Sequence, residues 1–180
     1  LEYVSIDSIA VYTDVHGLDE FDRSVVFSIP AYSMERKGEE IMNYMNSVAE
    51  GNFEGSWETL EDGAGVFTAT AKSMTGEQLN AFDSQVFPSQ NTYIEIDNNG
   101  AAASPFVFSR NIAEYIGLDN YMADNYTSVQ YEYFVKADTG YQVSVNGYND
   151  NGNTDYTLLW SGWCGSDGMQ IPLEIEKVYK

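Results

Sequence analysis

The last third of the sequence carries the pattern that most constrains the fold. Apolar and polar residues alternate from 128 to 136 and again from 141 to 146, and the turn-forming Asp138-Thr139-Gly140 separates the two runs. A period of two places alternate side chains on opposite faces of a strand, so each run predicts a strand with one solvated face. Two more strands are expected at 156–163 and around 171–175. Together the four strands predict an antiparallel meander from Ser128 to Val178.

The earlier part of the chain predicts a mixture of strands and helices. β-branched, alternating segments bounded by turn residues predict four more strands, at 3–13, 24–29, 65–72 and 92–97. The strongest helical pattern follows Ser33, a plausible N-cap, and Gly51 stands where a glycine would end the helix. The apolar residues that recur there at helical spacing are Ile41, Met42, Met45 and Val48.

Two shorter helices are also expected. Thr75 followed by Gln78 has the spacing of a capping box, which begins a helix by satisfying its first free amides. Ser109 is a candidate N-cap for a third helix, which would end at Gly117. Its apolar residues would be Ile112, Ala113 and Ile116.

These elements predict an α+β fold. We expect an antiparallel β-sheet with a C-terminal four-strand meander and two or three short helices packed on one face. The length of 180 residues suits a single compact domain over residues 1–180. If the chain were divided into two domains, the boundary would be expected in the Asn-Asn-Gly-Ala-Ala-Ala-Ser segment at 98–104.

The charge of the chain excludes two classes of partner. There are 28 acidic and 8 basic residues, the formal net charge is −20, and Arg36-Lys37 is the one pair of adjacent basic residues. Such a surface repels phosphate groups, so binding to nucleic acid or to an anionic membrane is disfavoured. The charge is explained either by solubility alone or by a basic ligand, a metal ion or a cationic partner surface.

Composition favours an extracellular or cell-surface location. A single cysteine, Cys164, allows no internal disulfide, and the 14 tyrosines with few basic residues suit a bacterial exported protein. No apolar run approaches the roughly 18 residues of a transmembrane segment. The chain begins at Leu1, in what is expected to be a strand, which indicates a mature or trimmed product whose export signal or anchor belonged to a missing N-terminal region. A trimmed cytosolic protein would begin in the same way, and composition favours export.

The sequence offers no strong catalytic constellation. His16 and Cys164 are the only histidine and cysteine, and no serine lies in a Gly-x-Ser-x-Gly elbow. A zinc site needs clustered Cys and His ligands, so zinc is rejected. The remaining enzyme hypothesis is an acid/base enzyme that uses carboxylates alone.

The segment from 149 to 155 is dense in the oxygen ligands that calcium prefers. The candidate ligands are Asn149, Asp150, Asn151, Asn153 and Asp155. A turn-rich hairpin loop is the competing interpretation, because Asn, Asp and Gly tolerate left-handed backbone conformations. Apart from calcium, no cofactor is expected.

Aromatic side chains are the other candidate binding groups. The candidates are Trp57, Tyr148, Tyr156, Trp160 and Trp163. Exposed rings stack on sugars or anchor protein interfaces, and Glu58, Glu61 and Asp62 lie near Trp57 in a segment expected to be a loop. The competing interpretation is a core role, because Tyr156, Leu158 and Trp160 would share one face of a regular strand.

These observations lead to one expected function and one alternative. We expect a non-catalytic extracytoplasmic domain of a bacterial surface protein or lipoprotein that binds a protein or cell-envelope partner. The alternative is a carbohydrate-binding or carbohydrate-active module that uses the aromatic residues and carboxylates.

Overall fold

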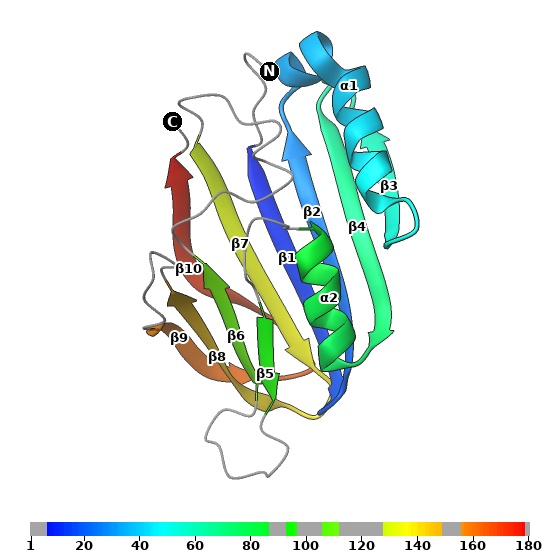
Figure 1. Cartoon of the computed structure of the whole chain (residues 1–180). Helices are drawn as coiled ribbons and strands as arrows, with labels where there is room; N and C mark the ends of the chain where they lie inside the picture. The colour runs from blue at the N-terminus through cyan, green and yellow to red at the C-terminus, as the bar shows by residue number, and fades with distance from the viewer. Residues whose placement is uncertain (1–6, 87–92, 97–105, 112–127, 149–155, 179–180) are drawn as a thin grey trace.

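The computed structural model describes residues 7–86, 93–96, 106–111, 128–148 and 156–178, and their side chains at 7–83, 85–86, 132–144 and 160–170 (Figure 1). Within these residues the protein has an α+β fold of two mostly antiparallel sheets and two helices, so the predicted fold class is confirmed. The 98–104 segment lies outside the described residues.

The larger sheet, sheet A, has six strands in the order β10-β7-β1-β2-β4-β3. Neighbouring strands are antiparallel except β1 and β7, which are parallel. Its strands are β1 (Ser8–Gly17), β2 (Glu20–Ile29), β3 (Glu54–Thr59), β4 (Gly65–Met74), β7 (Ser128–Ala137) and β10 (Met169–Val178).

The smaller sheet, sheet B, has four strands in the order β5-β6-β8-β9. The β6–β8 pair is parallel and the other two pairs are antiparallel. Its strands are β5 (Tyr93–Ile96), β6 (Phe106–Asn111), β8 (Tyr141–Tyr148) and β9 (Tyr156–Cys164).

The C-terminal meander is confirmed in its strands but wrong in their pairing. All four strands form, yet β7 pairs with β10 in sheet A and β8 pairs with β9 in sheet B. Alternation defines the two faces of a strand and says nothing about which strand lies beside it. The turn at Gly140, with a φ of 78°, carries the chain from one sheet into the other and does not close a hairpin.

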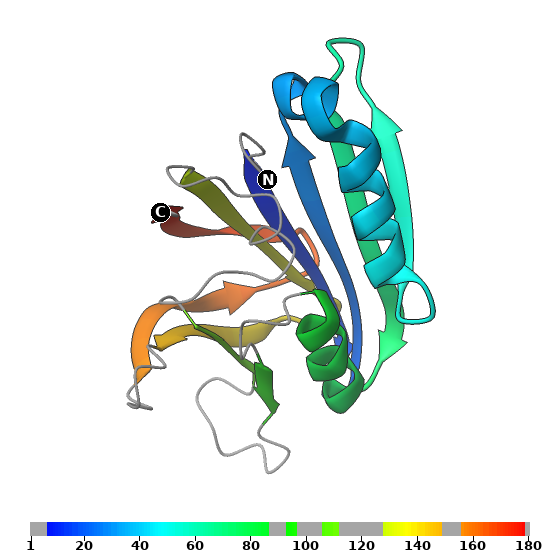
Figure 2. The ribbon, with the colours of Figure 1, turned by 45° about the horizontal axis from the view of Figure 1, so that its top comes forward.

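One face of sheet A forms the hydrophobic core. On β2, Phe21, Val25, Phe27 and Ile29 are buried, as period-two alternation requires. Figure 2 shows that α1, α2 and sheet B lie on this same side of sheet A, with α2 between the other two. Residues from both sheets and both helices therefore belong to one core cluster.

Helix α1 (Ala31–Ala49) begins two residues before the predicted N-cap. Pro30 occupies the N-cap position, and its carbonyl oxygen accepts hydrogen bonds from the amides of Ser33 and Met34. Ser33 is therefore buried inside the first turn instead of capping it. The predicted end is confirmed, since the helix stops at Ala49 and Gly51 has a φ of 76°.

Helix α2 (Gly76–Val86) confirms the predicted capping box. The Thr75 hydroxyl accepts from the Gln78 amide at 3.2 Å, and the Gln78 side chain accepts from the Thr75 amide at 2.9 Å. A buried ion pair between Arg23 of β2 and Asp83 anchors the helix to sheet A. Phe82 adds an edge-to-face contact with Phe53, their ring centres 5.6 Å apart.

The structure has strands in two places where the sequence predicts a helix start or a loop. Ser109 lies within β6 and caps no helix, and the rest of the predicted third helix, residues 112–117, lies outside the described residues. Strand β3 was expected to be a loop, because its Glu-Gly-Ser-Trp-Glu-Thr sequence lacks an apolar face. Among the described residues, no helix is both long and apolar enough to cross a membrane.

Candidate functional site

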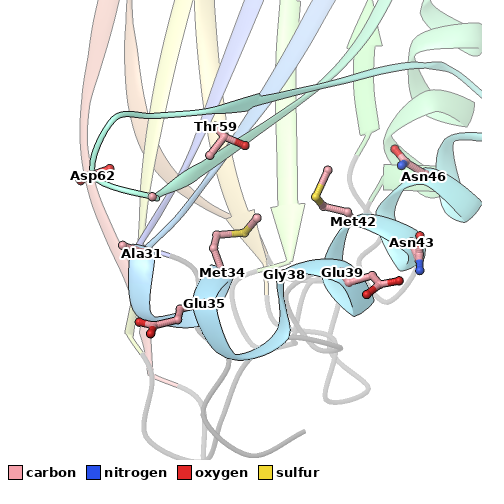
Figure 3. Close-up of a pocket in the computed structure, with 11 residues that line it drawn as sticks. Ala31, Met34, Glu35, Gly38, Glu39, Met42, Asn43, Asn46, Thr59 and Asp62 are labelled. Carbon is pink, nitrogen blue, oxygen red and sulfur yellow. The ribbon is translucent and has the colours of Figure 1, made fainter.

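A groove of about 670 Å³ lies between α1 and the β3–β4 hairpin (Figure 3). Its floor is formed by Met34, Gly38 and Met42 of α1, next to Ala31 and Gly63. Figure 3 shows both methionines pointing from the helix toward the hairpin that carries Thr59 and Asp62. Both methionine side chains are half-buried, so the floor is apolar and open to a ligand.

Helical spacing explains how one helix serves both the core and the groove. Residues four apart lie on one row of a helix surface, and Ile41, Met45 and Ala49 form the buried row. Met34, Gly38 and Met42 form the adjacent row, which lines the groove. The helical spacing of the sequence predicts Met42 on the core face with Ile41, but the structure assigns these two residues to different rows. Met34 and Gly38 were missed, and the signal for them is this second row at four-residue spacing.

The helix is kinked beside the groove. Lys37 departs from helical geometry, with φ −137° and ψ 16°. Gly38 follows directly, and glycine is a poor helix former that lets a helix bend. A Cβ on Gly38 would lie 3.4 Å from the Met34 Cε, so Met34 folds over the position that lacks a side chain.

The opposite wall of the groove is a tight β-turn. Gly63 donates its amide to the Leu60 carbonyl at 3.0 Å, and the Asp62 side chain accepts from the Ala64 amide at 2.9 Å. Gly63 has a φ of 90°, which L-residues with side chains rarely adopt. The turn therefore presents Asp62 at a fixed place on the groove.

Trp57 closes the β3 side of this region by packing inward. Its ring centre lies 5.1 Å from that of Phe67, and its Nε1 donates to the Asn46 Oδ1 at 3.1 Å. Asn46 lines the groove, so Trp57 positions a groove residue. Glu58 is exposed and follows Trp57 directly on β3, so the strand directs the two side chains to opposite faces.

The charged residues that line the groove are all acidic. Glu35 and Glu39 of α1 and Asp62 of the hairpin are exposed, and no described lining residue is basic. Arg36 and Lys37 lie on the same helix but do not line the groove, and the Lys37 Nζ contacts the Glu40 Oε1 at 3.4 Å. The groove thus combines an apolar floor with a negatively charged rim.

The other tryptophans differ in exposure. Trp160 is half-buried and packs against the core, whereas the Trp163 side chain is 64% exposed. The Trp163 indole lies across the Gly140 turn, where an added Cβ would come within 2.5 Å of the ring. Sheet B has a register shift, so Asn146 pairs with Leu158 while Val145 pairs with Trp160, and the regular alternation expected from Tyr156 to Trp160 is interrupted.

Polar side chains surround Trp163 on sheet B. Its strand partner is Gln142, whose side-chain amide donates to the Ser161 hydroxyl at 3.1 Å. The Ser144 hydroxyl donates to the same oxygen at 3.2 Å. Tyr148 and Tyr156 form the last backbone pair of this hairpin, and their side chains lie outside the described set.

His16 lies in a network of carboxylates at the end of β1. Its Nδ1 is 2.8 Å from Asp138 Oδ2 and its Nε2 is 2.9 Å from Asp22 Oδ2. The hydrogen bond with Asp22, then that with Asp138, raises the pKa of His16 to about 9. The pKa of Asp22 is also shifted. Burial raises it, but the hydrogen bonds with the Ser73 amide and His16 outweigh burial and hold the pKa of Asp22 below its usual value.

Two groups of this network, together with the neighbouring Asp14, have the spacing of a metal site. Asp14, His16 and Asp22 each offer a ligand atom, and these atoms lie within 4.8 Å of one another. Both nitrogens of His16 already form hydrogen bonds with carboxylates, so a metal ion would have to displace one of them. The arrangement is that of a charge-assisted hydrogen-bond bridge.

In the part of the chain that the structure describes, Cys164 and His16 do not form a nucleophile–base pair. Cys164 is fully buried, and burial raises the pKa of its thiol, which disfavours the nucleophilic thiolate. His16 already shares both ring nitrogens with carboxylates. The calcium ligands predicted at 149–155 lie outside the described residues.

A second groove of about 470 Å³ lies along β1, β7 and β10. The rings of Tyr12 and Phe134 stack there, with centres 4.6 Å apart and planes within 8°. Lys136 and Asp14 lie 3.7 Å apart across the same strands. This groove therefore has mixed charge, unlike the groove beside α1.

Comparisons with known proteins identify no relative: the sequence matches no protein-family model, and neither a curated protein nor a solved structure matches it significantly.

Proposed function

We propose that the chain is a non-catalytic, extracytoplasmic domain of a bacterial surface protein or lipoprotein, and that it binds a protein partner through the groove beside α1. The observation that carries this proposal is the apolar floor of Met34 and Met42 beneath a polar rim. Methionine side chains are flexible and polarisable, and they recur at surfaces that adapt to protein partners. The acidic composition supports a location at the cell surface.

Site-directed photo-crosslinking tests this proposal. A photo-reactive phenylalanine analogue at Asn43, on the rim of the groove, should crosslink a partner from a bacterial envelope extract. The same analogue at Tyr12, in the second groove, should give no such product. Crosslinks from Tyr12 alone, or turnover of a substrate in a hydrolase panel, would contradict the proposal.

A floor variant tests whether the groove itself is required. Met42→Lys places a charge on the apolar floor and should reduce the crosslink yield from Asn43 by about tenfold or more, because burying an apolar side chain stabilises a complex by about 1.5–3 kcal/mol. The matched control is Ala81→Lys on the exposed surface of α2, which should leave the yield unchanged. Equal yields from the two variants would show that the groove is not the binding site.

The exposure of Trp163 favours carbohydrate binding as a second candidate function. The Gly140 turn supports the indole, and hydrogen-bonding groups of Gln142 and Ser161 lie beside it. An exposed indole with polar neighbours suits the apolar face and hydroxyl groups of a sugar.

A glycan array followed by tryptophan-fluorescence titration tests this candidate. Sugar binding should quench or shift the emission of the protein, and Trp163→Ala should abolish binding. Tyr32→Ala is the matched control, because Tyr32 is an exposed aromatic residue of α1. Carbohydrate binding is rejected if no glycan on the array binds the protein, or if binding is unchanged in Trp163→Ala.

A further inference from the structure

We infer that the occupant of the groove beside α1 is a basic, amphipathic protein segment. Its apolar side chain lies over Met34 and Met42, and its flanking Lys or Arg side chains contact the acidic rim. This inference rests on the proposed function, because it names the chemistry of the partner for the same groove.

The dimensions of the groove suit a short segment of chain. A volume of about 670 Å³ falls within the range of about 300–1,000 Å³ that is usual for ligand pockets. Met34 and Met42 are eight residues apart on α1, which corresponds to about 12 Å along a helix. About four residues of extended chain, or two turns of helix, span that distance.

The floor suits an aliphatic or aromatic side chain. The two methionines are half-buried, and the Met34 methyl group lies over Gly38, which adds no side chain of its own. Unbranched thioether side chains adjust their rotamers around an inserted group. The kink at Lys37 lies beside this position, so the helix bends where the segment would lie.

The rim selects for positive charge. Acidic residues line the groove from both sides, with Glu35 and Glu39 on α1 and Asp62 on the hairpin. The net charge of −20 adds a long-range field that accelerates the approach of cationic partners. An acidic segment with the same apolar residues would meet repulsion from both walls.

Two synthetic peptides test the charge preference. Both are fluorescein-labelled dodecapeptides with identical leucine positions, one with lysine and the other with glutamate at all remaining positions. Fluorescence anisotropy with the full chain should show saturable binding of the lysine peptide and no binding of the glutamate peptide. Equal binding of both peptides would overturn the inference.

A matched pair of double variants distinguishes binding to the acidic groove from attraction to the net charge of the whole protein. Glu35→Gln/Glu39→Gln should weaken binding of the lysine peptide by about 5- to 20-fold, since each exposed ion pair contributes up to about a fivefold effect. Glu20→Gln/Glu77→Gln removes the same charge from exposed positions outside the groove and should change the affinity less than twofold. Equal losses in the two variants would show attraction to the net charge alone, which overturns the inference.

The two proposals fail in different ways. If Met42→Lys abolishes crosslinking of the partner while Glu35→Gln/Glu39→Gln leaves it unchanged, the groove binds a protein but charge does not select it. In that case the proposed function stands and the basic-segment inference is wrong. If Met42→Lys has no effect on crosslinking, the proposed function itself fails.

Discussion

At the scale of single residues, His16 links three parts of the chain. It lies near the end of β1 and bridges Asp22 of β2 to Asp138 of the β7–β8 turn. The Oδ1 of Asp22 also accepts the Ser73 amide at 2.8 Å. Ser73 has a φ of 53°, a left-handed conformation that serine adopts at a cost, and it lies where the β2–β4 register shifts. The bridge therefore holds a strained bulge and two turns together.

The raised pKa of His16 predicts how stability depends on pH. A group with a higher pKa in the folded state stabilises that state fully below its unfolded pKa of about 6.5, and loses this contribution as pH rises through about 9. The urea midpoint of the wild type should therefore exceed that of His16→Gln at pH 6, and the difference should shrink by pH 10.

Subtracting the variant's profile removes the effect of other groups that titrate near pH 9–10. A difference that stays constant from pH 6 to pH 10 would contradict the assigned hydrogen bonds. Asp138→Asn offers a second check, because loss of one carboxylate partner should reduce the difference without removing it.

At the scale of elements, the start of α2 is fixed from two sides. The capping box between Thr75 and Gln78 satisfies two backbone amides, and the Asp19 side chain in the β1–β2 turn accepts from the Gly76 amide at 2.8 Å. These contacts join α2 to a turn that is distant in sequence.

Removing the cap should destabilise the protein measurably. Thr75→Ala should cost about 1 kcal/mol and lower the Tm by about 2–4 °C in a thermal melt followed by circular dichroism. Thr139→Ala is the control, because Thr139 is exposed in a turn and caps no helix. Equal melting temperatures for the two variants would show that the capping box contributes little.

The same elements show what sequence patterns can predict. The capping box and Gly51 act through neighbouring residues, so the ends of α2 and α1 near them were predicted correctly. The row of Met34, Gly38 and Met42 was missed, because helical periodicity identifies an apolar stripe without showing where the core ends. Only the β3–β4 hairpin, which lies against that row, makes it a groove.

At the scale of the whole molecule, the strands were predictable and most of their partners were not. Of the ten strands in the described residues, eight overlap segments that the sequence pattern identified, and β3 and β6 do not. The division into two sheets depends on contacts between distant segments, such as the parallel pairing of Ser8–Val15 with Gln130–Ala137. Local patterns carry no information on such pairings, which tertiary packing decides.

Because β1 and β7 are far apart in the sequence, their parallel pairing can form only late in synthesis of the chain. One edge of β1 pairs with β2, which follows it directly in the sequence, but its other edge gains a partner only when residues 128–137 have been made. At a synthesis rate of about 5–20 residues per second, roughly 6–24 s separate the appearance of the two strands. For that interval one edge of β1 has no partner from its own sheet and is open to non-native pairing. Until residues 128–137 have been made, this unpaired edge of β1 is therefore a place where the nascent chain can aggregate.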